Sequence, residues 1–403
     1  MPIIASIHRI VPLVAVATLA GACATVSRLP VTVAQLVAQA DTFDVAEGAR
    51  RAAIVDELAR RAVRRGDATL DLLFLSGGGQ HGAFGAGYLR GWQERTDAPL
   101  PVFDLVTGVS TGALQSPYAL VGTRASIDAL GALYRDAADR VAPGVDWLAV
   151  LKLRRTGGIV DVSKLRGTVA TLVNDTLRAQ IARARDEGRQ LVVTSTDLDL
   201  GRQRSWNLGL ELQRADGVQR MRDALVASSA IPGIFPPIVI DGRVHADGGV
   251  VGNIAPILDL DGFRRLGARL RAEGVTTPVT VRTWVIMNVW VTAVPTVIDP
   301  ASRTDVGRRG NLMLLASQQR LLLGRLDELL HAVRAEVPNV RLEVRHVAIP
   351  DSLAIDPAAS RLFDKSWMLR LDSLGYARAR SNRPWDAPIS EVPTGAVPGV
   401  APR

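Results

Sequence analysis

The chain has 403 residues, of which 47% are apolar and 22% charged, and its formal net charge is +8. This composition is close to the globular average and excludes a disordered, collagen-like or coiled-coil protein, while the length allows two or three domains or one large α/β domain. The surplus charge comes from arginines spread along helical segments, without an aromatic-interleaved patch, zinc-ligand spacing or RNA-binding signature. We therefore expect no nucleic-acid partner.

Residues 1–22 have the features of a cleaved signal peptide. A polar start is followed by an apolar stretch and by three small residues directly before the single cysteine, Cys23. This pattern is typical of a bacterial lipoprotein, so we expect Cys23 to be the lipidated first residue of the mature chain, anchored in the cell envelope by its acyl chains. Ala24 stands where an aspartate would favour the inner membrane, which favours the outer membrane. An ordinary secretory signal with an incidental cysteine is the alternative.

The rest of the chain divides into three parts. Residues 23–69 hold the lipidated N-terminus, a tether and an amphipathic helix, residues 70–380 form one domain, and residues 381–403 are a Pro-rich flexible tail. Within the domain, short apolar strands alternate with helical patterns. This alternation predicts an α/β fold with a mostly parallel central sheet and helices on its faces. The expected elements are the tether over 24–40, helices over 44–65, 83–95 and 312–335, and strands over 72–75, 103–107, 190–196, 234–244, 279–291 and 340–347.

The apolar run over residues 283–298 could be mistaken for a membrane span. It is shorter than the roughly 18 residues that a spanning helix needs, and Asn288 and Pro295 interrupt it. We expect a buried strand there instead.

Gly108-Val109-Ser110-Thr111-Gly112 fits the G-x-S-x-G nucleophile elbow. The flanking glycines of this motif permit a sharp strand-to-helix turn that exposes the serine oxygen. The motif alone occurs often by chance, but here it stands between an apolar strand and a helix. Ser110 is therefore the candidate nucleophile, with Gly108 and Gly112 as its supporting residues.

A glycine loop, Gly77-Gly78-Gly79-Gln80-His81-Gly82, separates another strand from its helix. A phosphate-binding loop would carry a lysine and a serine or threonine after the last glycine, and neither is present. Closely spaced glycines also suit an oxyanion hole, since bare backbone N–H groups can approach a developing negative charge. We favour this second interpretation.

Asp247-Gly248-Gly249 is the third candidate motif. An aspartate before two glycines is most often a turn. A nucleophilic serine needs a group that takes its proton, however, and a carboxylate can do so directly. Asp247 is therefore the candidate base.

These three motifs, in this order and spacing, resemble those of the patatin-like phospholipases over residues 70–380. The resemblance implies a three-layer α/β fold and a phospholipase A-type acyl hydrolase of membrane lipids that needs no metal or cofactor. Ser110 would be the nucleophile, Asp247 its base, and Gly77, Gly78 and Gly79 the oxyanion loop, while Gly82, Gly248 and Gly249 belong to the matching motifs. Many family members have arginine or lysine where this chain has His81, so positive charge there depends on protonation.

Two alternatives remain open. An α/β-hydrolase triad, whose chain order is Ser, Asp, His, could use Ser110 and Asp247 with His331 or His346. The chain could also be a non-catalytic, lipid-binding envelope lipoprotein, although retention of both candidate residues and the glycine loop argues against this.

Overall fold

The computed structural model of the chain describes residues 28–141, 158, 160, 162–361 and 363–387. The expected signal peptide, Cys23 and most of the expected tail lie outside these residues. No helix of the described chain is long and apolar enough to cross a bilayer.

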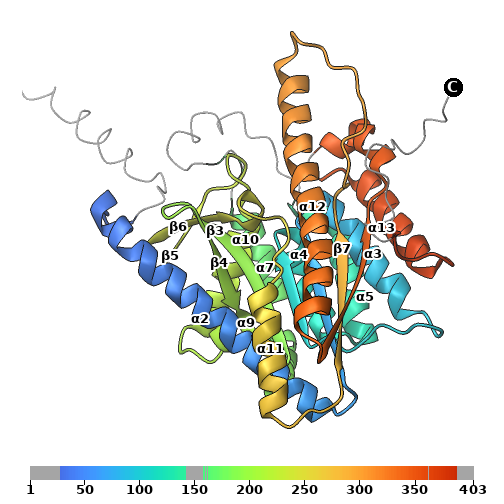
Figure 1. The fold of residues 1–403 in the computed structure, drawn as a ribbon. Coiled ribbons are helices and arrows are strands. Elements are labelled where there is room, and N and C mark those ends of the chain that lie inside the picture. The colour runs from blue at the N-terminus through green and yellow to red at the C-terminus, as the bar shows by residue number, and fades with distance from the viewer. Residues whose placement is uncertain (1–27, 142–157, 159, 161, 362, 388–403) are drawn as a thin grey trace, which may run out of the picture.

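Eight strands of the described chain form one mixed sheet (Figure 1). Their order is β5-β6-β3-β2-β1-β7-β8, with β4 paired to β3. The pairs within β3-β2-β1-β7-β8 are parallel, whereas β4 and β6 are antiparallel to β3 and β5 is antiparallel to β6. The mostly parallel sheet predicted from the sequence is therefore confirmed. The strands are β1 (Thr69–Leu75), β2 (Leu105–Val109), β3 (Gln190–Asp197), β4 (Arg202–Asn207), β5 (Ile238–Ile240), β6 (Arg243–Asp247), β7 (Val279–Met287) and β8 (Val340–Ala348).

Helices cover both faces of this sheet, which gives the three layers that were expected (Figure 1). The central strand β1 is buried on both sides, and its alternating side chains enter two separate cores. Leu73 and Leu75 pack with residues of α3, α4, α5, α7, α8, α10 and α13, whereas Leu72 and Phe74 pack with residues of α2, α11 and α12. The helices are α2 (Val33–Arg65), α3 (Gly82–Gln93), α4 (Thr111–Val121), α5 (Arg124–Val141), α7 (Ser163–Leu172), α8 (Asp175–Asp186), α9 (Leu208–Glu211), α10 (Gly217–Ser228), α11 (Leu260–Ala272), α12 (Arg303–Glu336) and α13 (Lys365–Arg380), and the 3-10 helices are η2 (Gly79–His81), η3 (Gly248–Val250), η4 (Asp351–Ile355) and η5 (Pro357–Ser360).

The N-terminal segment differs from its prediction. The residues expected as a tether are helical from Val33, because a capping box starts α2 early: the Thr32 side chain accepts from the Gln35 N–H, and the Gln35 side chain accepts from the Thr32 N–H at 2.8 Å. The strand expected over 234–244 is also different. It is the hairpin β5–β6, which turns at Asp241 and Gly242, both with positive φ (53° and 76°).

The chain after α13 packs against the domain before it leaves the described residues. The Trp385 ring lies 4.9 Å from the Trp92 ring and 5.1 Å from the Trp284 ring, centroid to centroid. The Asp386 carboxylate accepts a hydrogen bond from the Ala348 N–H at 2.9 Å. The packed chain thus extends at least to Asp386, past the expected start of the tail at residue 381.

Candidate functional site

Ser110 lies at the sharp turn between β2 and α4. Its backbone has φ 54° and ψ −122°, a combination that a non-glycine residue keeps only where its surroundings enforce it. Two glycines make the turn possible, because a Cβ on Gly108 would overlap the Gly112 carbonyl and one on Gly112 would overlap the Leu75 carbonyl. The strand, turn and helix expected around Ser110 are therefore all present.

Two serines from the end of α10 hold this backbone in place. The Ser110 N–H donates to Ser228 Oγ at 3.0 Å, and Ser229 Oγ donates to the Ser110 carbonyl at 3.2 Å. Ser228 and Ser229 are both buried. The sequence offered no physical signal for this role, because two serines at a helix end are common.

One edge of β3 brings Asp247 to Ser110. Thr194 pairs with Val109 of β2, and the next residue, Ser195, pairs with Asp247 of β6. Because β4 occupies the other edge of both β3 residues, β2 and β6 must follow one another along the same edge. The C-terminal end of β6 therefore meets the end of β2, where Ser110 stands.

The Asp247 carboxylate is buried and only partly hydrogen-bonded. Its Oδ1 accepts from the Gly249 N–H at 2.8 Å, whereas Oδ2 has no hydrogen-bond partner within the described chain. Burial raises the pKa of Asp247 from 3.8 to about 6, although the nearby Ser110 hydroxyl and the Gly249 N–H act in the opposite direction. At pH 7 most of this carboxylate is ionised, and one of its oxygens can still accept a proton.

The glycine loop packs directly against Ser110. A Cβ on Gly77 would lie 3.1 Å from Ser110 Cβ. The Gly77 N–H is already used, since it donates to the Asn253 carbonyl at 3.0 Å. The N–H groups of Gly78 and Gly79 have no acceptor among the described residues, and Gly79 opens the 3-10 helix that leads into α3. Of the three predicted oxyanion donors, the structure leaves these two available.

Asn288, which follows β7, fixes the start of this loop. Its N–H donates to Ser76 Oγ at 2.7 Å, its Nδ2 donates to the Ser76 carbonyl at 2.8 Å, and its Oδ1 accepts from the Gly85 N–H at 3.0 Å. Asn288 is fully buried. Sequence reasoning treated it only as an interruption of an apolar run. An amide at the carboxyl end of a buried strand was the available signal, because such a group must be bonded to nearby backbone.

His81 adds no positive charge to the loop. Its Nε2 donates to the Ala359 carbonyl at 3.1 Å, and its ring lies 5.0 Å from that of Trp290. Burial lowers the pKa of His81 to about 4. The imidazole is therefore neutral at pH 7 and serves to tie the loop to η5.

The other three histidines of the described residues do not approach Ser110. His346 is on β8, three strand spacings or about 14 Å from β2 across the sheet. His331 is exposed near the end of α12 that leads into β8, and its Nδ1 donates to the Asp327 carbonyl at 2.8 Å. His245 contacts Ser195 Oγ through Nδ1 at 3.1 Å. The geometry thus does not assemble the alternative triad.

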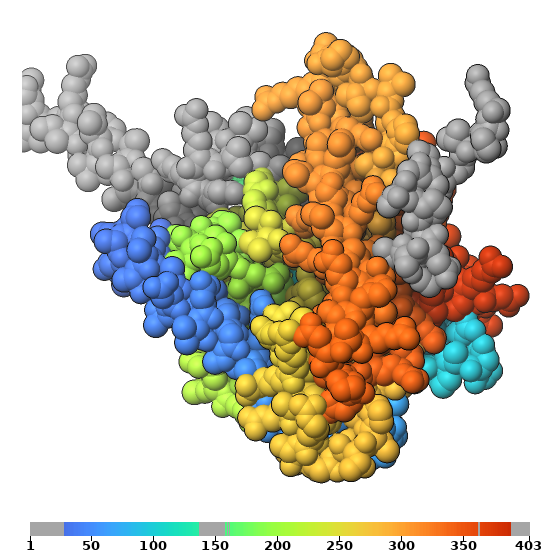
Figure 2. Space-filling model, in the orientation of Figure 1, coloured from blue at the N-terminus to red at the C-terminus, as the bar shows by residue number. Residues whose placement is uncertain are grey.

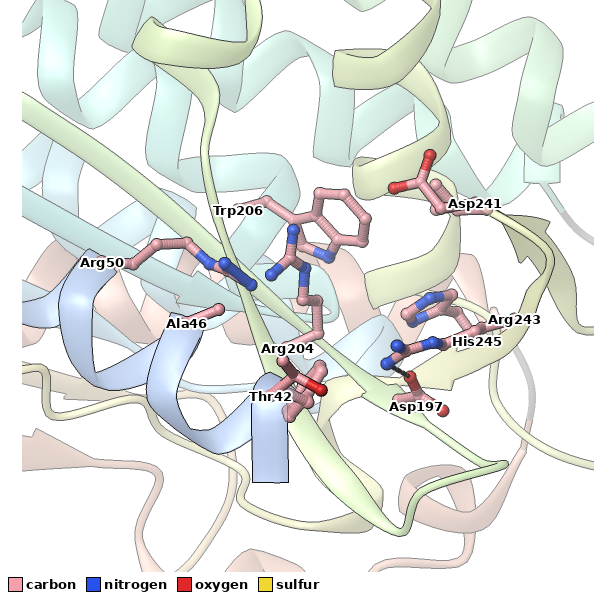
Figure 3. A pocket seen from close by; sticks show the side chains of 11 residues that line it. Thr42, Ala46, Arg50, Asp197, Arg204, Trp206, Asp241, Arg243 and His245 are labelled. Carbon is pink, nitrogen blue, oxygen red and sulfur yellow. Dashed lines mark hydrogen bonds and ion pairs between the residues drawn. The ribbon is translucent and has the colours of Figure 1, made fainter. Parts of the chain in front are cut away.

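A cavity of about 270 Å³ lies between α2 and the β4 and β6 strands (Figure 3). Its arginines already have carboxylate partners: Arg204 pairs with Glu47 at 2.8 Å, and Arg243 pairs with Asp197 at 3.2 Å. Neither Ser110 nor Asp247 lines it, so it is not the substrate pocket of that pair. Elsewhere in the described chain, no group of three His, Cys, Asp or Glu side chains is placed to hold a metal ion.

Comparison with known proteins gives one family. Residues 73–261 match the family model for patatin-like phospholipase. No curated protein matches the chain. Among solved structures, VipD from Legionella pneumophila is similar with a TM-score of 0.32 and 13% identity; the match covers 77% of this chain and 66% of that one, so this chain spans just under two thirds of the length of that protein.

Proposed function

We propose that the chain hydrolyses ester bonds of membrane phospholipids with Ser110 and Asp247, because residues 73–261 match the model of the patatin-like phospholipases, a family of lipid acyl hydrolases. One observation carries the proposal. Because β2 and β6 meet on one edge of β3, a buried carboxylate oxygen that has no partner among the described residues lies beside a serine on a strained turn.

In the first half of the reaction, Ser110 Oγ bonds to the ester carbonyl carbon while its proton passes to Asp247. The protonated Asp247 then gives this proton to the oxygen of the leaving lysolipid, and an acyl-serine remains. In the second half, Asp247 takes a proton from water and the water oxygen attacks the acyl carbonyl. The fatty acid leaves, and Ser110 regains its proton. A carboxyl with a pKa of about 6 is suited to both transfers, since it can hold and release a proton near neutral pH.

The oxyanion that forms in both halves is bound by the Gly78 and Gly79 N–H groups, which have no other acceptor in the described chain. Each such donor contributes about 3–4 kcal/mol of transition-state stabilisation. Gly77 has a different part in this proposal: through its bond to the Asn253 carbonyl it holds the loop against Ser110.

Anchoring to the bacterial envelope through a lipidated Cys23 belongs to the same proposal, with the outer membrane as the favoured location. It rests on the signal-like pattern of residues 1–22. Expression of Cys23→Ser in a bacterial host, followed by membrane fractionation, tests it. The variant should move to the soluble fraction, and a variant that stays tightly bound to membranes would contradict lipidation.

The hydrolase is tested with mixed-chain phospholipid vesicles, with the released fatty acids and lysolipids identified by mass spectrometry. Ser110→Ala and Asp247→Asn should both abolish release. Ser126→Ala is the matched control, because Ser126 is also buried but bonds only within the helical layer, to the Tyr118 carbonyl at 2.8 Å. Full activity in both Ser110→Ala and Asp247→Asn would refute the pair.

Two further outcomes separate the alternatives. Loss of turnover in a folded His331→Ala or His346→Ala protein would favour the triad. A folded protein whose Ser110 does not react with a fluorophosphonate probe would favour the non-catalytic lipid-binding module.

A further inference from the structure

The N-terminal part of α12, residues 303–321, exposes an apolar stripe. Val306, Met313, Leu314 and Leu321 are 51%, 48%, 66% and 66% exposed. At 100° per residue these four positions fall within about 100° of the helix circumference, and they extend along about 22 Å of its axis. The opposite face carries the buried residues Ala316, Gln319 and Leu323. The helix thus presents one apolar face to the protein and another to solvent.

This stripe is on the side of the molecule where Ser110 is. α12 ends where β8 begins, so its first half lies toward the carboxyl ends of the parallel strands, and it stands out beyond the sheet (Figures 1 and 2). The Asn253 N–H donates to Gln318 of α12 at 3.2 Å, and Asn253 also binds the loop that packs against Ser110. Helix α12 is therefore connected through Asn253 to the loop that packs against Ser110.

Other exposed apolar residues occur on the same side. Val297, in the loop between β7 and α12, is 98% exposed, and Leu29, Val33 and Val37 are exposed around the start of α2. α2 leads into β1, so its start also lies toward the carboxyl ends of the strands (Figure 1).

The charges beside the stripe indicate what it contacts. Arg303, Arg309 and Arg320 lie on or next to it, and none of the three forms an ion pair with another described residue. Unpaired arginines beside aliphatic side chains are typical of helices that lie in the interface of an anionic bilayer. A second protein copy is a poorer fit, because four aliphatic side chains supply only a fraction of the roughly 1,200 Å² that a stable interface buries.

We propose that the N-terminal part of α12, residues 303–321, docks onto the surface of an anionic phospholipid bilayer and so places the site around Ser110 at its substrate. The proposal rests on the phospholipid hydrolase proposed above. It gives the catalytic domain its own contact with lipid, separate from an anchor at Cys23.

The test compares Leu314→Asp/Leu321→Asp with Val102→Asp/Leu210→Asp. Val102 and Leu210 are also exposed, but they precede β2 and follow β4, at the opposite end of the sheet. All proteins carry Cys23→Ser so that no acyl anchor contributes. Each is assayed for sedimentation with vesicles of phosphatidylcholine and phosphatidylglycerol, for fatty-acid release from them, and for hydrolysis of a short soluble ester.

The stripe variant should lose vesicle affinity and vesicle activity by about tenfold or more, since burying one leucine side chain is worth at least that factor. Its soluble-ester rate should stay within about twofold of the parent, and the control variant should match the parent in all assays. A second variant, Arg309→Glu/Arg320→Glu, leaves the apolar residues intact and should lose affinity only for the vesicles that contain phosphatidylglycerol.

Unchanged vesicle affinity in both variants would overturn the docking proposal. So would a dimeric parent and a monomeric stripe variant in light scattering, since the stripe would then be an interface between copies. Failure of the hydrolase proposal is distinguishable, because the parent would then bind vesicles through the stripe while cleaving neither substrate.

Discussion

Asp247→Asn should abolish catalysis and at the same time stabilise the fold. Burial raises the pKa of Asp247 from 3.8 to about 6. The folded chain therefore holds the proton of this carboxyl group more tightly than the unfolded chain does. Stability therefore falls as the pH rises from about 4 to about 6, and above that the full penalty is present. A difference of about two pH units, at 1.36 kcal/mol each, corresponds to about 3 kcal/mol.

The asparagine carries no charge, and its Oδ1 can still accept from the Gly249 N–H, which bonds Asp247 at 2.8 Å. We expect Asp247→Asn to raise the free energy of unfolding by up to about 3 kcal/mol at pH 8 and by almost nothing near pH 4, where the wild-type carboxyl is protonated. Urea unfolding of both proteins at the two pH values measures this.

Asp104→Asn is the control. Asp104 is equally buried, but it accepts from Arg61 at 2.9 Å and from Arg65 at 2.6 Å, so loss of its charge should destabilise the chain by about 3–5 kcal/mol. Two results would refute this reasoning: an Asp247→Asn protein no more stable than wild type at pH 8, or one equally stabilised at both pH values. Either would show that the buried charge of Asp247, with one oxygen lacking a hydrogen-bond partner in the described chain, does not destabilise the fold.

Three further predictions follow from the same geometry. The kcat/KM for a soluble ester should fall about tenfold per pH unit below the Asp247 pKa of about 6, because only the carboxylate accepts the serine proton; a profile that falls only near pH 4 would contradict this. Gly112→Ala should lower kcat by about 100-fold, because its Cβ would push the Ser110 turn away from the Leu75 carbonyl, and steady-state kinetics on the folded variant check it. Asn288→Ala should destabilise the chain by about 2–4 kcal/mol in urea unfolding, since the buried Ser76 carbonyl and Gly85 N–H lose the side-chain partners that Asn288 supplies; an unchanged midpoint would contradict this.

Local sequence signals predicted the elements that carry the motifs. Strand β1 and the turn at Ser110 are encoded by short apolar runs that end in glycine, and both were placed within a few residues. The strand expected over 279–291 is β7, which ends at Met287, so only the first five residues of the apolar run over 283–298 are strand. Such signals work because a strand buried on both faces needs a continuous apolar run.

The way in which these elements pair in the sheet could not be predicted from the sequence. No local pattern indicates that β2 and β6 share an edge of β3, because that depends on strand pairing between distant segments. Strand β4 was missed for a related reason: Arg202–Asn207 is mostly polar, and it is held by pairing with β3 rather than by an apolar pattern of its own. The bond from the Gly77 N–H to the Asn253 carbonyl is likewise a tertiary contact, so the sequence could not indicate that one of the three candidate oxyanion donors is already engaged.

The shared edge of β3 also bears on the time at which the chain becomes active. Residue 247 follows residue 110 by 137 positions, and β3 lies between them in the sequence. During synthesis the serine turn and β3 therefore leave the ribosome well before the aspartate that completes the pair. A nascent or truncated chain that ends before β6 has the nucleophile without its proton acceptor. For the lipid hydrolase proposed above, this order delays the attack on lipid until β6 has joined the sheet.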